Sequence, residues 1–473
     1  MINTKNKNKM KTKKDFSRRK FVKKTIASGI VLNIIPAYVL GGSGHISPND
    51  KLNISLSGTR DAITWNDLTK DEKDLLNLIE KKAFDFFWET YNSTTGLMGD
   101  ADVARNRCSI ASVGFGLSAF CIADIRGWVN HQEVYDRVLK TLNSFYKDSA
   151  KGNDIYVEGT HGLFYHFINT NTGKRNGKSG VSTIDSAILM AGILHTMQHF
   201  KGTEIENLAR NIYLNAEWDW FIRENGAIAG TWRPETGLTG EYKGYNEYIL
   251  VYLLGLGSPT HSIPQSSWKV WASGPGFRWQ KPYEDIGPFL TPHGEMRPEA
   301  YLYQFPACWF DFRRKKDHYA DYWENGVNAL KANRRICINW GKEHHYPEEL
   351  WGWTACNGPD GYQGFMHPYN GTIAPSAVAA SMPFIPDLSL PTLKYMYDKY
   401  SDKIWGKYGF TDAFNPYQNW YDDRFLGIDQ GNMVLMLENF RSGMVWKEFM
   451  SVPYVKEAMK KAGFLQNKQI SRD

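Results

Sequence analysis

Two consecutive segments between residues 182 and 221 constrain the fold most, because their hydrophobic patterns are opposite. Residues 182–200, STIDSAILMAGILHTMQHF, are apolar around nearly the whole circumference of a helix. Residues 204–221, EIENLARNIYLNAEWDWF, place Ile205, Leu208 and Ile212 along one stripe, with charged residues opposite. A helix that is apolar all round must be enclosed by protein, whereas a one-sided helix faces solvent. The two segments therefore predict an inner helix followed by an outer one.

The same order recurs elsewhere in the chain. The almost wholly apolar residues 109–125, SIASVGFGLSAFCIADI, are followed by the amphipathic residues 131–146, HQEVYDRVLKTLNSFY. Thr69 and Glu72 form a capping-box pattern that predicts the start of the first helix. Hydrophobic periodicity predicts further helices near residues 110–127, 132–147, 182–200, 204–222, 245–257, 298–312, 318–335, 375–383, 390–400, 427–441 and 452–462.

This succession predicts the fold class. No long run alternates polar and apolar residues, as the strands of a large sheet would. Inner and outer helices in alternation are typical of nested helical hairpins. We therefore expect residues 71–465 to form an all-α domain, an (α/α)6 toroid of six hairpins joined by long aromatic loops.

The N-terminal residues resemble an export signal. Ser17-Arg18-Arg19-Lys20-Phe21 precedes the moderately apolar TIASGIVLNIIPAYVLGG, as in a twin-arginine signal. A short membrane anchor is the alternative, but its length and Pro36 disfavour a permanent span. We expect residues 1–45 to be the signal and residues 46–70 a polar extension. The protein is then exported, to the periplasm or to the membrane surface.

Charge and cysteine content exclude several classes of function. The formal net charge is +6, but the basic residues crowd into the first 24 positions, so a nucleic-acid partner is not expected. The five cysteines are widely spaced and contain no C-x-x-C pair, which argues against a disulfide framework or a zinc cage and favours buried thiols. The histidines lack metal-ligand spacing, and no GxGxxG or GxSxG motif occurs. We expect no metal, no other cofactor and no stable protein partner.

Long loops rich in glycine and aromatic residues separate the predicted hairpins. They include GTWRPETGLTGEYKGYNE, GWTACNGPDGYQGFMHPYNGT and WGKYGFTDAFNPYQNWYDD. Structured loops of this length usually carry function, and flat aromatic rings suit stacking against sugars, although the same residues can build a core. An oligo- or polysaccharide is the expected substrate. The candidate binding residues are Trp232, Arg233, Tyr245, Tyr303, Gln304, Trp351, Trp353 and Gln430.

Glu247 is the leading candidate for a catalytic acid. It lies in GYNEYILVYLLGLGSPTH, where an apolar inner helix is predicted to begin. Glycosidic hydrolysis needs one carboxyl group that donates a proton and another that activates water or attacks carbon. The aromatic surroundings of Glu247 are expected to raise its pKa toward that of a proton donor. The alternative is a capping carboxylate at the helix N-terminus.

Two further acids occupy matching positions. Asp185 stands at the start of the predicted helix in VSTIDSAILMAG, and Asp429 does so in GIDQGNMVLMLEN. Either could instead be an ordinary helix cap. Weaker candidates are Glu299, Asp311, Asp412 and Glu438, of which Asp311 is expected to pair with a nearby arginine.

Taken in order, several segments resemble the bacterial glucoamylase-like domain family, whose characterised hydrolases include the β-1,2-glucanases of glycoside hydrolase family 144. The segments are FDFFWETYNSTTGLMGD, SIASVGFGLSAF, GLFYHFINTNTGKR with VSTIDSA, GYNEYILVYLLGLGSPTH, WFDFR, LWGWTACNGPDGY, and YGFTDAFN with GIDQG. The resemblance extends from about residue 75 to residue 450.

The resemblance implies a six-hairpin toroid, no metal cofactor and inverting hydrolysis of β-1,2-linked glucan at the periplasm or cell surface. Glu247 matches the position of a general acid. Asp429 is our preferred base, acting directly or through a relay of water or a substrate hydroxyl, and Asp185 is the second choice. One departure concerns substrate binding, because relatives often carry a Glu shortly before the S-T-I-D block, where this chain has Lys178-Ser179-Gly180-Val181.

Two other functions remain compatible with the sequence. A polysaccharide lyase on the same fold would use a Tyr or His base and an arginine, here Arg107, His166, Tyr245 and Arg313. The loops contain no dense cluster of basic residues, which disfavours this reading. A glycan-binding protein without turnover would keep the aromatic loops and lack the chemistry.

Overall fold

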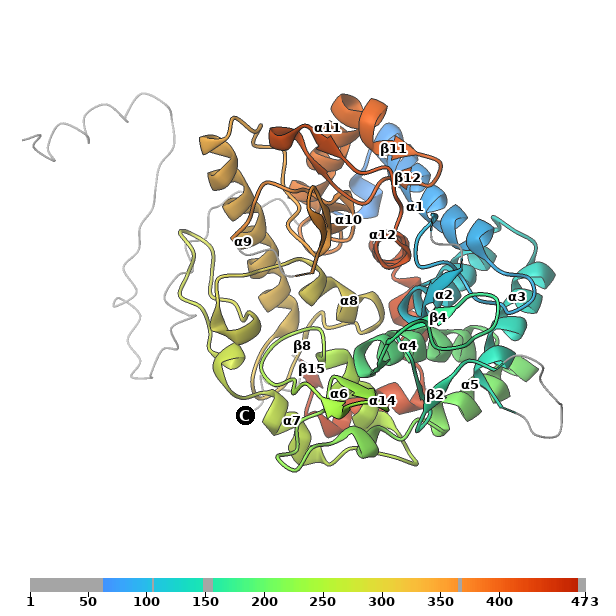
Figure 1. Cartoon of the computed structure of the whole chain (residues 1–473). Coiled ribbons are helices and arrows are strands. Elements are labelled where there is room, and N and C mark those ends of the chain that lie inside the picture. Colours follow the sequence, from blue (N-terminus) through green and yellow to red (C-terminus); the bar gives the residue numbers. More distant parts are fainter. Residues whose placement is uncertain (1–62, 104–105, 148–155, 365–367, 467–473) are drawn as a thin grey trace, which may run out of the picture. The chain divides into compact units, whose positions relative to one another are not determined.

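The computed structural model describes residues 63–103, 106–147, 156–364 and 368–466. The predicted export signal and residues 46–62 of the predicted extension lie outside this range. Residues 60–473 form one compact unit, whose helices are coloured along the sequence in Figure 1. Within the described part of the chain, no helix has both the length and the apolar character needed to cross a membrane.

The described residues are rich in helix, as the sequence predicts. The α-helices are α1 (Lys70–Thr90), α2 (Ile110–Arg126), α3 (His131–Phe145), α4 (Thr183–His199), α5 (Glu204–Leu214), α6 (Ile249–Gly257), α7 (Gln265–Trp271), α8 (Tyr301–Trp309), α9 (Tyr322–Glu343), α10 (Pro375–Ala379), α11 (Pro386–Ile404), α12 (Gly427–Arg441), α13 (Met444–Phe449) and α14 (Pro453–Lys461).

Short strands occur in the connections between these helices, and the described residues contain no sheet of more than three strands. The largest sheet joins β5 (Val181–Ser182), β6 (Thr231–Arg233) and β7 (Gly237–Thr239). The antiparallel pairs are β1 (Arg107–Ser109) with β4 (Phe167–Asn169), β2 (Gly159–Thr160) with β3 (Leu163–Phe164), β8 (Lys315–Lys316) with β15 (Leu465–Gln466), β9 (Cys356–Gly358) with β10 (Gly361–Gln363), β11 (Trp405–Gly406) with β12 (Gly409–Phe410), and β13 (Phe414–Asn415) with β14 (Trp420–Tyr421).

The predicted contrast between inner and outer helices is confirmed. Nearly every residue of α2 and α4 is buried, whereas α5 buries only one side of its surface. Helix α4 packs against α2, α5 and α6, and α12 packs against α1, α2, α8 and α10, as Figure 1 also shows. The all-apolar helices are thus surrounded by other helices, which is the environment that their composition requires.

Local signals set several helix boundaries. At the start of α1, the Thr69 hydroxyl accepts a hydrogen bond from the backbone N–H of Glu72, whose carboxylate accepts from the backbone N–H of Thr69. This is the predicted capping box, with both of its bonds made. Two predicted helix boundaries differ from those in the structure. Helix α6 begins at Ile249 rather than near 245, and α9 continues to Glu343 rather than ending near 335.

Two glycines allow α2 and α4 to approach closely. A Cβ atom at Gly192 would lie 2.1 Å from the carbonyl oxygen of Gly114, and one at Gly114 would lie 2.3 Å from that of Ile188. Both obstacles are backbone atoms of rigid helices, so they cannot move aside as a flexible side chain could. The close contact fixes the start of α4, and with it Asp185, relative to α2.

We expect Gly192→Ala to destabilise the protein by about 1–3 kcal/mol, the usual cost of overpacking. In an ordinary helix the same change stabilises by about 0.5–1 kcal/mol. Gly116→Ala in α2 is the matched control, because its new Cβ would meet mainly the flexible Met98 side chain. Urea denaturation measures both variants. A Gly192→Ala variant as stable as the control would contradict the proposed contact.

Candidate active site

Four carboxylic acids lie where inner helices begin. Asp185 is in the first turn of α4 and Asp429 in the first turn of α12. Glu247 comes two residues before α6, and Glu299 two residues before α8. A side chain in such a position is held by a helix that is itself fixed by packing, which gives a functional group a defined location.

Glu247 is not the cap of α6. No side chain caps α6, and the side-chain oxygen of Asn246 accepts a hydrogen bond from the Tyr248 backbone N–H at 3.0 Å, in the turn that precedes the helix. Glu247 is half-buried and forms no ion pair with any described residue. Burial raises the pKa of the Glu247 carboxyl to about 7, and the charges of Glu299 and Asp185 act in the same direction. The group therefore holds its proton in the range where a general acid must.

Asp185 lies beside a histidine. Its Oδ2 lies 3.4 Å from Nδ1 of His166, and the side chain is 15% exposed. Capping of α4 falls to Ser182, whose hydroxyl accepts from the Asp185 backbone N–H at 3.3 Å. The contact with His166 has no direct signal in the sequence, because only tertiary packing brings the loop that carries the histidine to Asp185.

Asp429 forms a pair with Asp412, which lies in the loop after β12. The two carboxyl groups are hydrogen-bonded to each other, and both residues are buried. Burial and the charge of Asp429 raise the pKa of Asp412 well above its usual range. Burial also raises the pKa of Asp429, to about 6, but hydrogen bonds from Ser376 and Asp412 limit the rise. The two carboxyl groups therefore titrate as a pair, in which burial and the neighbouring carboxylate disfavour a second negative charge.

Further hydrogen bonds hold this pair in place. The Asp412 Oδ2 accepts from the Asn357 backbone N–H at 2.7 Å, and the Asp429 Oδ1 accepts from the Ser376 hydroxyl at 2.8 Å. The Asn357 side chain donates to Asp422, which also pairs with Arg424 at 3.0 Å. Asp422 thus has a cation of its own, whereas Asp429 has none among the described residues.

Two tyrosines connect the acids on either side. Burial, and then the charges of Glu247 and Glu299, raise the pKa of Tyr301. Burial, and then the charges of Asp429 and Asp412, raise the pKa of Tyr362 in β10. The charge of Tyr362 also raises the pKa of Tyr301, so these two tyrosines lie between the influence of both groups of acids.

Tyr362 is the aromatic residue that sequence reasoning missed. It is 56% exposed, yet enough protein surrounds it for dehydration to raise the pKa of its hydroxyl. Solvent access together with dense surroundings describes a side chain in a recess rather than on a convex surface. The alternation of hydrophobicity around β9 and β10 is too short to have indicated it.

Most of the predicted sugar-binding residues lie in the core. Trp351 and Trp353 are 0% and 1% exposed, so neither offers a ring face to a sugar. Gln304 donates to Ala377 and Ser381 and accepts from Asn432. The residues of this set that the structure places in the core are Tyr245, Tyr303, Gln304, Trp351, Trp353 and Gln430. Protein atoms enclose these side chains, so packing is the role that the structure shows for them.

Trp232 and Arg233 remain partly accessible. Both belong to β6, the middle strand of the three-stranded sheet that leads into α4. Arg233 Nε donates to the carbonyl of Lys178 at 3.3 Å, which leaves the rest of the guanidinium available. These two residues are the members of the predicted set that could reach a ligand near Asp185.

Other predicted candidates have structural partners. Asp311 pairs with Arg313 at 2.9 Å, as the sequence predicts. Glu438 is buried between Arg126 and Arg441. These ion pairs make both acids part of the framework.

The residues considered for a lyase are also engaged. Arg107 pairs with Asp100 at 2.6 Å, and Arg313 is occupied by Asp311. The ring of Tyr245 is buried against Tyr303. All five cysteines are free and buried, which confirms the sequence-based expectation for them. The described residues contain no group of three His, Cys, Asp or Glu placed to hold a metal ion.

Comparison with known proteins identifies the family of this chain. The glycoamylase family model, described as "Putative glucoamylase", matches residues 240–453, which include Glu247, Asp412 and Asp429. A crystal structure described in the same terms, from Bacteroides uniformis, is 31% identical, covers 84% of this chain and 99% of its own, and superposes with a TM-score of 0.78. The chain belongs to the glucoamylase-like family.

Two relatives in this family carry a named activity. An endo-β-1,2-glucanase from Chitinophaga pinensis, solved with sophorotriose and glucose, is 29% identical, covers 84% of this chain and 99% of its own, and gives a TM-score of 0.76. An exo β-1,2-glucooligosaccharide sophorohydrolase acting at the non-reducing end, from Parabacteroides distasonis, is 29% identical over 428 residues. That alignment covers 82% of this chain, which spans only 58% of the length of the Parabacteroides protein.

The unpaired burial of Glu247 predicts a pH-dependent effect of Glu247→Gln on stability. The folded-state pKa is raised from 4.5 to about 7, so the wild type loses stability as pH rises through this interval. The loss is on the order of 3 kcal/mol. Relative to the wild type, the variant should therefore gain stability between pH 4 and pH 8, as followed by thermal unfolding.

Asn246→Ala provides the contrast, because loss of the hydrogen bond from the Tyr248 backbone N–H should cost about 1 kcal/mol at every pH. If Glu247→Gln destabilised the protein increasingly toward high pH, Glu247 would have to be ion-paired in the folded state.

Proposed function

We propose that this chain hydrolyses a β-glucan, β-1,2-glucan or sophoro-oligosaccharides, with inversion at the anomeric carbon. The observation that carries the proposal is the presence of two acids that differ in proton affinity. Glu247 retains its proton, whereas Asp429 shares the single charge of a carboxyl pair with Asp412. The relatives named for activity on β-1,2-linked glucans support the choice of substrate.

Glu247 is the proposed general acid. Its proton passes to the glycosidic oxygen as the bond to the anomeric carbon breaks, so the leaving sugar departs as an alcohol. The nearby Glu299 and Asp185 carboxylates disfavour the charged form of Glu247, and so keep this carboxyl group protonated before the reaction. Solvent returns the proton to Glu247 after the product leaves.

Asp429 is the proposed general base. It accepts a proton from the attacking water, directly or through a substrate hydroxyl, while that water forms the new bond to the anomeric carbon. Asp412 holds its own proton and donates a hydrogen bond to Asp429, so the pair can take up one more proton during the reaction. Asp185 stays the second choice for this role, although its contact with His166 gives it a partner.

Accessible side chains near the acids are the proposed substrate contacts. Trp232 and Tyr362 offer aromatic surfaces, and Arg233 offers hydrogen-bond donors. Aromatic platforms of this kind stack against the apolar faces of glucose units, which matches a saccharide substrate and no nucleic acid or protein partner.

We also propose that helices α2, α4, α6, α8, α10 and α12 form the inner ring of an (α/α)6 toroid. The contacts of α2 with α4 and α12, and of α4 with α6, support this arrangement. The twin-arginine-like residues 17–23 support export of the enzyme to the periplasm or the membrane surface, where a polymeric glucan is accessible.

Activity on two substrates separates the roles of the two acids. Glu247→Gln should lower kcat/KM on linear β-1,2-glucan by about 10²–10⁴-fold, the usual contribution of a general acid. On a dinitrophenyl β-sophoroside the loss should be much smaller, because that leaving group needs no proton. Asp429→Asn should lower the rate on both substrates. Reducing-sugar and dinitrophenolate release are the measurements, and NMR of the first product should show the α-anomer.

Asp311→Asn serves as the control, because Asp311 belongs to an ion pair of the framework. A Glu247→Gln variant with an unchanged rate on β-1,2-glucan would remove the assigned role of the acid. Loss of both activities in Asp185→Asn but not in Asp429→Asn would move the base to Asp185. Binding of β-1,2-glucan without any product in the wild type would indicate a glycan-binding protein.

A further inference from the structure

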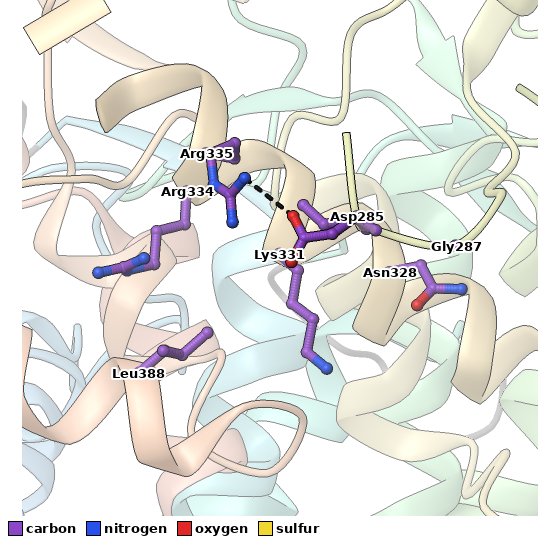
Figure 2. Close-up of a pocket in the computed structure, with 8 residues that line it drawn as sticks. Asp285, Gly287, Asn328, Lys331, Arg334, Arg335 and Leu388 are labelled. Atoms are coloured by element: carbon purple, nitrogen blue, oxygen red, sulfur yellow. Dashed lines mark hydrogen bonds and ion pairs between the residues drawn. The ribbon is translucent and has the colours of Figure 1, made fainter. Parts of the chain in front are cut away.

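A polar pocket lies beside α9, and none of the four acids of the candidate active site lines it. Its cavity of about 310 Å³ is lined by Asn328, Lys331, Arg334 and Arg335 of α9, together with residues 285–287 and Leu388 of α11. Figure 2 shows the side chains of Lys331, Arg334 and Arg335 extending from this helix, with Asp285 beside Arg335.

The charge of Arg335 is already balanced. Its guanidinium pairs with Glu284 and, at 2.9 Å, with Asp285. Both carboxylates have a lowered pKa: the hydrogen bond from Asn339 and that from Arg335 lower the pKa of Glu284, and its own backbone N–H and Arg335 lower that of Asp285. This ion-pair group forms one wall of the pocket and attracts no further anion.

Arg334 and Lys331 differ in this respect. Neither forms an ion pair with a described residue, and the Nε–H of Arg334 is buried without a hydrogen-bond acceptor. Burial, and then the charge of Arg335, lower the pKa of Arg334, while Glu348 and Asp387 offset part of that effect from beyond ion-pair distance. A buried cationic donor without an acceptor is costly unless a ligand supplies one.

The walls of the pocket are held in place. The Asn328 side chain donates to the carbonyl of Pro288 at 3.1 Å and so ties the loop to α9. Gly287 packs directly against this side chain, since a Cβ atom there would lie 2.9 Å from the Asn328 amide nitrogen. Arg335 fixes Asp285 on the other side. A site whose walls are preorganised loses little entropy when a ligand binds.

We propose that this pocket binds a compact oxyanion, a phosphate or carboxylate group, at the guanidinium of Arg334, with Lys331 on another side of the same cavity (Figure 2). A guanidinium fork offers parallel donors to the oxygens of such an anion, and the ammonium group of Lys331 adds a second positive charge to the pocket. A cavity of about 310 Å³ is larger than an inorganic anion alone and has the size of a small-molecule site. The anion can therefore arrive free or as a charged group on a sugar.

Titration calorimetry on the full chain tests the proposal with inorganic phosphate, glucose 6-phosphate, glucuronate and glucose at constant ionic strength. We expect saturable binding of the anionic probes and none of glucose. Tighter binding of glucose 6-phosphate than of phosphate would assign a sugar-borne anion, whereas equal binding would assign the free anion.

Arg334→Gln and Lys331→Gln should each weaken phosphate binding about tenfold or more, as expected for loss of a charge-assisted hydrogen bond. Arg334→Lys should retain part of the affinity. Lys456→Gln is the matched control, an exposed lysine on α14 far along the chain from this pocket. Hydrolysis of β-1,2-glucan should be unchanged in all four variants. Absence of saturable binding, or equal binding by Arg334→Gln and Lys456→Gln, would overturn the proposal.

Discussion

The account depends on the dehydration of one carboxyl group that no cation compensates. Glu247 precedes α6, every residue of which is buried, and its half-buried side chain meets other acids rather than a basic partner. An acid in this environment keeps its proton well above its ordinary pKa. The cost is tolerated because Asn246, and not Glu247, completes the turn that opens the helix. Glu247 is thereby free of a structural duty.

Other buried acids of the chain are treated differently. Although burial alone would raise the pKa of Glu448, hydrogen bonds from His195 and His199 hold it at about 2. Glu438 likewise lies between two arginines. Partners of this kind stabilise the charged carboxylate, which then has no proton to donate. Among the described residues, acids without a cation occur at the starts of α6 and α12, and the proposed mechanism uses the difference in proton affinity between them.

The hydrophobic pattern was sufficient to predict most helices, although not the short α7 and α13, and the placement of Asp185, Glu247 and Asp429 at inner-helix starts. Composition could not show which aromatic residues of the loops face a ligand. Trp353 and Tyr362 both lie in the glycine-rich segment GWTACNGPDGYQG, but Trp353 is buried and Tyr362 is exposed in the fold. Asp412 was underrated for a related reason. Asp412 matters because it interacts with Asp429. Tertiary packing creates this interaction, and no spacing pattern in the sequence predicts it.

The protonation of Glu247 is the quantity that decides this account. Carbon-13 NMR of glutamate carboxyl groups, with the Glu247→Gln variant used to assign the signal, follows that protonation directly. We expect the Glu247 signal to titrate with a midpoint near pH 7 in the free enzyme. A midpoint near 4.5, the ordinary value for glutamate, would show that Glu247 is charged at neutral pH and would contradict its role as the proton donor.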